Sequence, residues 1–264
     1  MRSSSDISGQ GRSITNDQNQ IRSGDLRDGP YQLSIVGLGS NGDRGLTEEA
    51  IIAIKEAEIV LGYNLYLKQA EKFISLGAQV VSSTMTEEIK RSQMAIDLAL
   101  SGRKVALVSG GDPGVYAMSG ALFELAAELQ LSLGTNPGQL LITVVSGTTA
   151  VTAAAALLGA PLTHDFCTIS LSDRLTDWET IVFRLDLASR AGFVIALYNP
   201  KSRGRDWQLS EAVKVLLKNL TPSTPVGIVS RVGRFNQQVS ITDLERLPEG
   251  KIDMQTIVIV GNSS

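Results

Sequence analysis

From residue 31 onward, short apolar runs alternate with segments whose apolar residues recur at helical spacing. The helical segments are TEEAIIAIKEA (47–57), TEEIKRSQMAIDLALSG (86–102) and YAMSGALFELAAEL (116–129). The first two begin with a threonine followed by acids, which predicts a capped helix start. The apolar runs are LSIVGLG (33–39), EIVLGY (58–63), KVALVSG (104–110) and QLLITVVSG (139–147). Alternation of this kind predicts a mostly parallel sheet with helices on both faces.

The second half of the chain continues the alternation but ends differently. Helical patterns cover 148–159, 177–190 and 207–220, and strand patterns cover 166–172, 193–200, 225–232, 237–242 and 255–261. The last three strands follow one another through short polar turns, which predicts antiparallel pairing. We therefore expect the α/β class with two α/β domains, 31–147 with a mostly parallel sheet and 148–264 with a mixed sheet. Residues 1–30 are rich in Ser, Gly, Asn, Gln and Asp, and this composition predicts a disordered leader.

Composition narrows the classes of function. A net charge of -3 over 264 residues gives no sign of the basic surface that nucleic-acid binding needs, so we expect no nucleic-acid partner. Cys167 is the only cysteine, which excludes an internal disulfide and a cysteine-based metal site and is typical of a reducing cytosol. No run approaches the about 20 apolar residues that cross a membrane, and the N-terminus has no apolar signal core. We expect a cytoplasmic protein without a metal site or membrane contact.

Residues 37–42 read GLGSNG and match the G-x-G-x-x-G pattern of dinucleotide-binding folds. Two features argue against that function. DRGL separates the last glycine from Thr47, whereas the pattern requires the helix to open within the glycines. The second predicted strand ends LGYN, without the acid that would bind a ribose hydroxyl. A tight turn from strand to helix explains the glycines equally well.

A second glycine-rich strand end is SGGDPG (109–114). In an open α/β sheet, ligands bind beyond the C-terminal ends of the strands, and glycines there let a ligand approach the backbone. Taken alone, Asp-Pro-Gly is an ordinary turn. Turn-forming strand ends recur, however, at 37–42, 146–148 and 198–200. The recurrence predicts a cleft lined by bare strand ends and suited to a large, flat or semi-polar ligand.

Five segments occur in the order VGLGSNGDRGLTEEA, VSGGDPGVYAM, VVSGTTAVTAAAALLGAPLTHDFCTISLSD, ALYNPKSR and TPVGIVSRVGR. Together they resemble the tetrapyrrole methylases, the class III S-adenosylmethionine (SAM) methyltransferases, over essentially all of 31–264. Within that family, GAPLTHDFCTISLSD, LYNPKSR and MQTIVIVGNSS are most similar to methylases of cobalamin biosynthesis. The resemblance implies a SAM cleft between the two domains, a tetrapyrrole substrate and a homodimer. It also implies methylation of carbon 17 of precorrin-3B, or of its cobalt-containing counterpart, with ring contraction to give precorrin-4.

The resemblance further implies that SAM is held largely by the backbone of 110–116. The chain departs from the family pattern at Ser40 and Ser146, where members usually have proline. Serine can adopt the same backbone angles at a cost of about 0.5–1 kcal/mol each in chain entropy, so we expect a looser SAM site. The SAM-lining residues that the resemblance assigns are Gly37, Gly39, Gly111, Asp112, Val115, Tyr116, Thr148, Thr149, Leu197, Tyr198 and Gly227.

Ring contraction needs proton transfers, for which two residues are candidates. His164, the sole histidine, could titrate near neutrality, or it could cap or pack at the end of the preceding helix. Asp173 closes the motif SLSD, and it could instead cap the next helix.

A substrate with many carboxylates needs hydroxyl and cationic partners. Ser170 and Ser172 alternate and would therefore share one face of their strand. Arginine binds carboxylates in a bidentate fork, and Arg231 stands at a strand end, which favours binding. For Arg205 we favour an ordinary surface charge. The predicted substrate-binding residues are Ser170, Ser172, Lys201, Arg203 and Arg231.

Two other functions stay open. A methylase of the same fold could act on another precorrin, on ribosomal RNA or on diphthamide, although work on RNA would favour an added basic surface. A non-catalytic protein could bind SAM or a tetrapyrrole and transfer nothing, a possibility suggested by Ser40 and Ser146.

Overall fold

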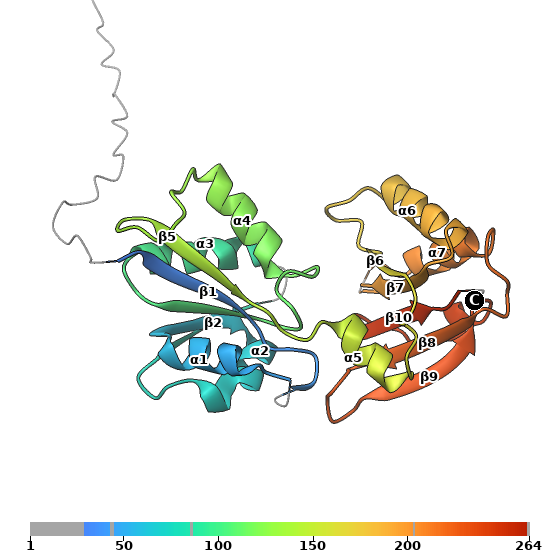
Figure 1. Cartoon of the computed structure of the whole chain (residues 1–264), viewed down its shortest axis with the longest axis horizontal. Helices are drawn as coiled ribbons and strands as arrows, with labels where there is room; N and C mark the ends of the chain where they lie inside the picture. Colours follow the sequence, from blue (N-terminus) through green and yellow to red (C-terminus); the bar gives the residue numbers. More distant parts are fainter. Residues whose placement is uncertain (1–28, 43–44, 85–86, 203, 263–264) are drawn as a thin grey trace, which may run out of the picture.

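The computed structural model describes residues 29–42, 45–84, 87–202 and 204–262, so residues 1–28 of the predicted leader lie outside it. The chain forms two sheets of five strands, each with its own helices (Figure 1). The first sheet has the order β3-β2-β4-β1-β5, and every pair of neighbours is parallel. Its strands are β1 (Tyr31–Gly37), β2 (Ile59–Tyr63), β3 (Gln79–Ser83), β4 (Val105–Ser109) and β5 (Leu140–Val145).

Helices cover both faces of the first sheet, because its inner strands are apolar on both sides. On β1, Leu33 and Ile35 pack toward α3 and α4, whereas Val36 packs toward α1 and α2. Thr47 caps α1 as predicted, and its hydroxyl accepts a hydrogen bond from the Ala50 amide at 3.1 Å. The helices are α1 (Glu48–Glu56), α2 (Asn64–Ala70), α3 (Glu88–Leu100) and α4 (Met118–Glu128), with a short 3-10 turn, η2 (Glu71–Phe73).

The second sheet is mixed and has the order β6-β7-β10-β8-β9. β6 and β7 are parallel, and all other neighbours are antiparallel. α6, α7 and the short 3-10 turn η3 (Leu247–Glu249) lie on one face, and α5 lies on the other. The strands are β6 (Phe166–Ser170), β7 (Val194–Tyr198), β8 (Pro225–Ser230), β9 (Gln238–Asp243) and β10 (Thr256–Val260); the helices are α5 (Ala150–Leu157), α6 (Trp178–Arg190) and α7 (Gln208–Leu216).

The predicted fold class, two α/β domains with a parallel and a mixed sheet, is confirmed. Three local expectations need correction. The predicted antiparallel pairing is confirmed for β8 with β9, but β10 lies between β7 and β8, so β9 and β10 do not pair although they are consecutive. The residue at the N-cap of α3 is Glu87 without a side-chain cap bond, and the predicted cap, Thr86, lies outside the described residues. The sequence reasoning also missed α2 and β3.

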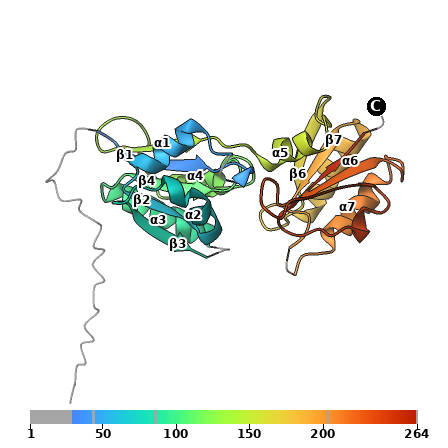
Figure 2. The ribbon, with the colours of Figure 1, turned by 90° about the horizontal axis from the view of Figure 1, so that it is seen from below.

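A single connection, from the end of β5 to the start of α5, joins the two domains (Figures 1 and 2). β1 pairs with β5, β4 pairs with β1, and all three strands run in the same direction. Their C-terminal ends therefore all lie toward this connection. A second contact is made by the turn after β8, where the backbone of Gly233 lies against Asn41 of the first domain. Among the described residues, no helix is long and apolar enough to cross a membrane.

Candidate active site

Three backbone segments touch where the first sheet meets the connection to α5. Gly39 and Gly111 exchange backbone hydrogen bonds of 3.1 and 3.2 Å. A β-carbon at Gly37 would lie 2.7 Å from the Gly147 nitrogen and 2.8 Å from the Gly111 oxygen. A β-carbon at Gly147 would meet the Gly111 oxygen and lie 2.8 Å from the Gly39 nitrogen. The glycines at 37 and 147 are therefore required by backbone packing, a reason that the sequence alone did not reveal.

Asp112 ties these segments together with both of its carboxylate oxygens. Oδ1 accepts the backbone N–H of Gly114 at 2.8 Å, and Oδ2 accepts the backbone N–H of Gly147 at 3.1 Å. The first bond forms an Asx turn, and the second fastens the loop to the connection between the domains. The carboxylate therefore acts within the protein, in addition to any contact it makes with a ligand.

Tyr116 reaches from the first domain to the second. Its hydroxyl donates a hydrogen bond to the carbonyl oxygen of Thr168 on β6 at 2.8 Å, and its ring centroid lies 5.0 Å from that of Tyr198. Its φ angle is 51°, which is strained for an aromatic residue, and Asn199 and Arg231 share this conformation. Strained residues of this kind persist where the surrounding structure holds them, often at functional sites. Val115, one residue earlier, is partly buried in the same turn.

Tyr198 holds the start of α5. Its hydroxyl accepts the backbone N–H of Val151 at 3.0 Å and lies 2.6 Å from the hydroxyl of Thr149, the N-cap residue. Burial raises the pKa of Tyr198, although the hydrogen bonds with Thr149 and Val151 oppose the rise, so the phenol stays neutral at physiological pH. Thr148 is close as well, since a β-carbon at Gly111 would lie 4.0 Å from its carbonyl oxygen.

Two predicted SAM-lining residues lie inside the packing of the second domain. Leu197 is fully buried on the face of β7 that packs against α6 and α7. Gly227 lies on β8 facing α5, where a β-carbon would meet the side chain of Leu158. Because side chains alternate along a strand, Tyr198 points to the α5 face and Leu197 points away from it. The Leu197 side chain therefore cannot line the site around Tyr116 and Tyr198.

The polar residues after β6 form a second group. Asn199 Nδ2 donates to Ser170 Oγ at 2.9 Å, and the Ser172 amide donates to the same oxygen at 3.2 Å. The strand ends at Ser170, so the expectation that Ser170 and Ser172 share a strand face is wrong. Asp173 does not cap the next helix either. Its Oδ2 accepts from Gln208 Nε2 at 3.0 Å.

Asp177, rather than Asp173, caps α6. Its Oδ1 accepts the Thr180 backbone N–H at 2.7 Å. Gln208, the partner of Asp173, is 1% exposed, and its Oε1 has no hydrogen-bond partner among the described residues. Asp173 thus helps to satisfy a buried amide at the start of α7.

Arg205 is also not the free surface charge that we expected. Its Nη1 donates to the carbonyl oxygen of Leu171 at 2.7 Å, and its Nη2 donates to that of Asn199 at 2.9 Å. One guanidinium group therefore connects the chain just beyond β6 to the chain just beyond β7. Desolvation by burial lowers the pKa of Arg205, and the negative charge of Asp173 opposes that change.

Replacing Arg205 by methionine is expected to lower the free energy of unfolding by about 2 kcal/mol, because two carbonyl oxygens lose their donor. The same change at Arg174, which is exposed, should leave stability within about 0.5 kcal/mol. Urea unfolding of both variants measures the difference. Equal stability of the two variants would show that the Arg205 hydrogen bonds contribute nothing.

The remaining predicted cations differ in their surroundings. Arg231 forms an ion pair with Asp253 at 2.6 Å, so its charge is already matched within the protein. Burial alone would raise the pKa of Asp253, but hydrogen bonds from Thr256 and Gln255 and the charge of Arg231 lower it. Lys201 lines an open hollow of about 380 Å³ together with Asp253. Arg203 lies outside the described residues.

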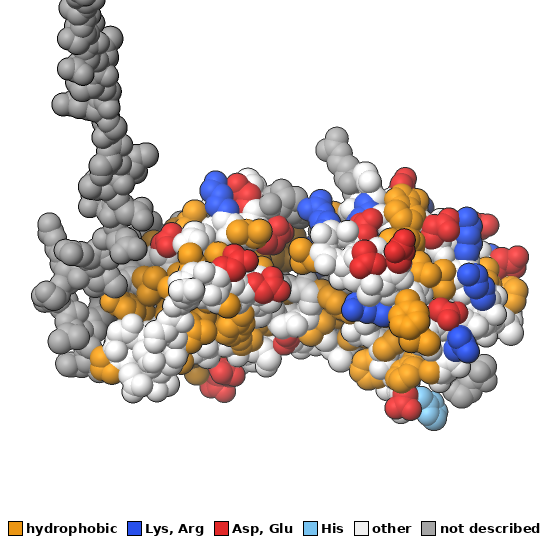
Figure 3. Space-filling view, turned by 90° about the horizontal axis from the view of Figure 1, so that it is seen from above, with side chains coloured by type: hydrophobic (Ala, Val, Ile, Leu, Met, Phe, Trp, Pro, Cys, Tyr) orange, Lys and Arg blue, Asp and Glu red, His pale blue; other side chains and the backbone are white. Residues whose placement is uncertain are grey.

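His164 is exposed in the turn before β6, as the pale blue side chain in Figure 3 shows. It lies four residues before Thr168, the residue that Tyr116 contacts, and no hydrogen bond or ion pair of its side chain is found among the described residues. Its catalytic role stays a prediction without a contact to support it. The same view shows acidic and basic side chains intermixed over this face (Figure 3).

Residues 32–248 match the family model described as Tetrapyrrole (Corrin/Porphyrin) Methylases. This chain therefore belongs to the tetrapyrrole methylase family. It is 43% identical over 232 residues to the probable cobalt-factor III C(17)-methyltransferase of Salmonella typhimurium, covering 88% of this chain and 93% of the relative. It is 40% identical over 233 residues to the precorrin-3B C(17)-methyltransferase of a Sinorhizobium species, covering 87% and 88%.

Not every relative has the same extent. The chain is 41% identical to the cobalt-factor III methyltransferase of Priestia megaterium but spans only 42% of its length. Among solved structures, the methyltransferase CobJ is 36% identical with a TM-score of 0.79, covering 88% of this chain and 94% of that chain. A uroporphyrin-III C-methyltransferase from Thermus thermophilus, complexed with S-adenyl homocysteine, shares the fold at 21% identity and a TM-score of 0.65, covering 87% and 97%.

Proposed function

We propose that this chain is a SAM-dependent C-methyltransferase acting on carbon 17 of precorrin-3B or of cobalt-factor III, with ring contraction, in cobalamin biosynthesis. The observation that carries the proposal is the 43% identity that extends over 93% of the Salmonella relative. The fold is consistent with it, since the match with the solved methyltransferase CobJ covers 94% of that chain and therefore includes both domains.

Two glycines of the loop 110–116 leave the backbone accessible to a cofactor. A β-carbon at Gly111 would find its nearest neighbour, Ser40 Oγ, at 3.5 Å, and one at Gly114 would meet only the chain's own Asp112. Gly37 and Gly147, by contrast, are closed off by backbone on several sides. The backbone is therefore more open at Gly111 and Gly114 than at Gly37 and Gly147, and this supports placing SAM on that side of the loop, next to Tyr116.

SAM supplies a methyl group on a positively charged sulfur; when the methyl is transferred, the electron pair of the broken C–S bond stays on sulfur and leaves S-adenosylhomocysteine. The protein's part is to bind, to orient and to exclude water. Positioning of this kind can supply about 7–11 kcal/mol of a barrier in favourable cases. Asp112 orients the loop through Gly114 and Gly147, and the contact between the rings of Tyr116 and Tyr198 links the loop to the second domain.

Several finer properties belong to the proposal. We assign a homodimer, a cytoplasmic location and no nucleic-acid partner, which light scattering, cell fractionation and an RNA-binding assay would each test. Whether Ser40 and Ser146 loosen the SAM site would be tested by replacing each with proline, which should tighten S-adenosylhomocysteine binding.

The direct test incubates the purified protein with methyl-labelled SAM and either precorrin-3B or cobalt-factor III. We expect one added methyl group and the absorbance change of ring contraction with one of the two macrocycles. The macrocycle that reacts shows whether the substrate contains cobalt. Cofactor binding without transfer to either macrocycle would overturn the assignment and favour another acceptor or a binding-only protein.

A further inference from the structure

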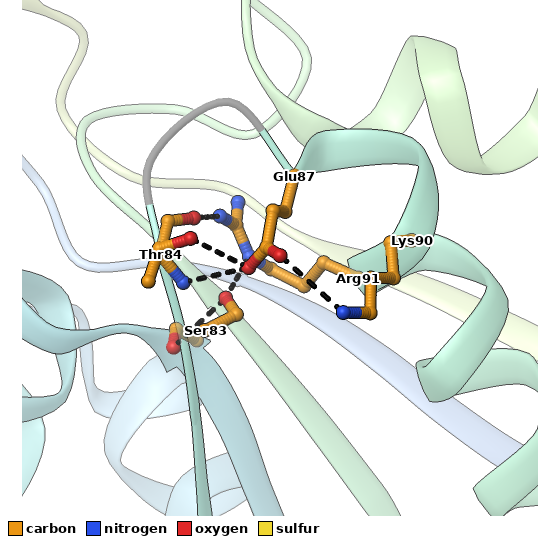
Figure 4. A network of polar contacts seen from close by, with 6 residues as sticks. Ser83, Thr84, Glu87, Lys90 and Arg91 are labelled. Carbon is orange, nitrogen blue, oxygen red and sulfur yellow. Dashed lines mark hydrogen bonds and ion pairs between the residues drawn. The ribbon is translucent and has the colours of Figure 1, made fainter.

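Arg91 is a buried cation without an acidic partner. It lies in α3 and is 5% exposed. Nε donates to Ser83 Oγ at 2.5 Å, Nη2 donates to the Thr84 carbonyl oxygen at 2.8 Å, and Nη1 lies 3.3 Å from Met118 Sδ. Figure 4 shows the side chain held against the end of β3. All three acceptors are uncharged, so nothing among the described residues neutralises this guanidinium in an ion pair.

The acid beside Arg91 in sequence is committed elsewhere. Glu87 accepts from the Thr84 hydroxyl at 2.7 Å and its amide at 3.0 Å, and it pairs with Lys90 at 3.3 Å (Figure 4). The hydrogen bonds from Thr84, with that from Lys90, lower the pKa of Glu87 to about 2. Its negative charge is thus balanced by groups other than Arg91.

The buried guanidinium group of Arg91 has N–H donors that make no hydrogen bond to any described residue. Arginine carries five N–H donors in a planar fork, and Arg91 uses three of them, one on a weak thioether acceptor. Burying a charge is costly unless a counter-charge and further hydrogen bonds compensate. A negatively charged ligand group would supply both.

Two further hydrogen-bond donors, Tyr66 and Arg234, lie near the loop 110–116 or the strand ends next to it. A β-carbon at Gly110 would lie 2.7 Å from Tyr66 Cζ and 2.9 Å from its hydroxyl oxygen, so the phenol borders the start of the 110–116 loop. Arg234 comes from the second domain, in the turn after β8 whose Gly233 touches Asn41. Neither the Tyr66 hydroxyl nor the Arg234 side chain has a hydrogen-bond or ion-pair partner within the described part of the chain.

The electrostatics agree with this placement. Burial raises the pKa of Tyr66, and the positive charges of Arg234 and Arg91 oppose the rise. The geometry places all three groups at one edge of the first sheet. Tyr66 follows β2, whose last residue Tyr63 pairs with Ser83, the residue that Arg91 binds. One turn beyond Tyr66 on α2, Gln69 donates to the carbonyl oxygen of Gly42, and a β-carbon at Gly42 would lie 2.9 Å from the carbonyl oxygen of Gly233, next to Arg234. Two cations, one from each domain, and a hydroxyl donor thus lie on the side of the first sheet that carries the loop that we assign to SAM.

We propose that Arg91, Arg234 and Tyr66 bind a carboxylate of the tetrapyrrole substrate. The inference rests on the proposed function, which makes a polycarboxylate the substrate. SAM also has a carboxylate, but the ammonium group next to it would be repelled by two guanidinium groups. The acetate and propionate side chains of a precorrin carry no such cation, and the fork geometry of arginine matches them.

The test compares R91Q, R234Q and Y66F with a control, R103Q, in the full-length protein. Arg103 is a partly exposed arginine paired with Glu58, at the opposite end of β4 from this group. We expect the KM for the macrocycle to rise about 10- to 100-fold in R91Q and R234Q, because a hydrogen bond to a charged group is lost, and about 3- to 10-fold in Y66F. The dissociation constant for S-adenosylhomocysteine, measured by calorimetry, should stay within about twofold of wild type in all four variants.

The possible outcomes distinguish a failure of the proposed carboxylate site from a failure of the proposed methyltransferase function. R91Q could unfold because Arg91 is buried, but R234Q and Y66F change partly exposed side chains and keep the test decisive. Folded R234Q and Y66F variants with a wild-type KM for the macrocycle would overturn the proposal. Weakened S-adenosylhomocysteine binding with an unchanged KM would also overturn it, because these residues would then bind the cofactor and not the macrocycle. If the wild type transfers no methyl, the proposed function fails, and titration of the variants with uroporphyrin III, an octacarboxylate, decides the carboxylate site by itself.

Discussion

Replacing Gly147 by alanine is expected to abolish S-adenosylhomocysteine binding and to lower the free energy of unfolding by about 2–3 kcal/mol. The added β-carbon would meet the Gly111 oxygen and lie 2.8 Å from the Gly39 nitrogen and 2.9 Å from the Gly37 carbonyl carbon. All three neighbours are backbone atoms, so no flexible side chain can move aside. The connection between the domains would have to shift away from the loop that we assign to the cofactor.

Gly120 offers a matched control in the same domain. It lies in α4 with no heavy atom within 4 Å of the position of a β-carbon. Alanine there should stabilise the protein by about 0.5–1 kcal/mol, since it reduces the freedom of the unfolded chain. Urea unfolding and calorimetry on both variants make the comparison. A folded Gly147→Ala protein that binds S-adenosylhomocysteine like the wild type would show that the junction tolerates a wider spacing.

Replacing Asp112 by asparagine is expected to weaken S-adenosylhomocysteine binding about 10- to 100-fold and to cost about 1–3 kcal/mol of stability. The carboxylate accepts two backbone N–H groups, from Gly114 and Gly147, with its two oxygens. An amide has only one oxygen, so one of these bonds is lost and an NH₂ group is left facing an N–H donor. The loop would then lose its attachment to the connection between the domains.

Asp177→Asn is the control for the change of Asp112. Asp177 accepts the Thr180 N–H as the N-cap of α6, and asparagine is nearly as good a cap. Its stability should stay within about 0.5 kcal/mol of the wild type. If Asp112→Asn behaved like the control in both unfolding and ligand binding, the carboxylate would have no role beyond that of any turn residue.

The elements that the sequence predicted best are those with strong local patterns. β1, β2, β4 and β5 are rich in apolar residues, and α1 carries both a cap and a first-turn acid pair. β3 was missed because it is an edge strand with mostly exposed side chains, and so has no apolar run. The helix α2 begins at Asn64, immediately after β2 ends at Tyr63, so no separate turn segment marks its start.

The candidate site divides in the same way. Glycines at strand ends, the motif at 109–114 and the tyrosines at 116 and 198 were all visible in the sequence, and the structure links them through short contacts. The sequence could not show that Leu197 points into the core, because that depends on which face of the second sheet each helix covers. Nor could it show that Arg205 binds backbone while Arg91 lacks a counter-charge.

The sequence by itself determined the alternating strands and helices, the change from a parallel to a mixed sheet, and the family. These follow from hydrophobic periodicity and turn residues, which act over a few neighbouring positions. Only the tertiary structure decided which polar atoms meet. The bond between Asp112 and Gly147 spans 35 residues, and that between Tyr116 and Thr168 spans 52. Such partners are chosen by how sheets and loops pack, and no local pattern in the chain records that choice.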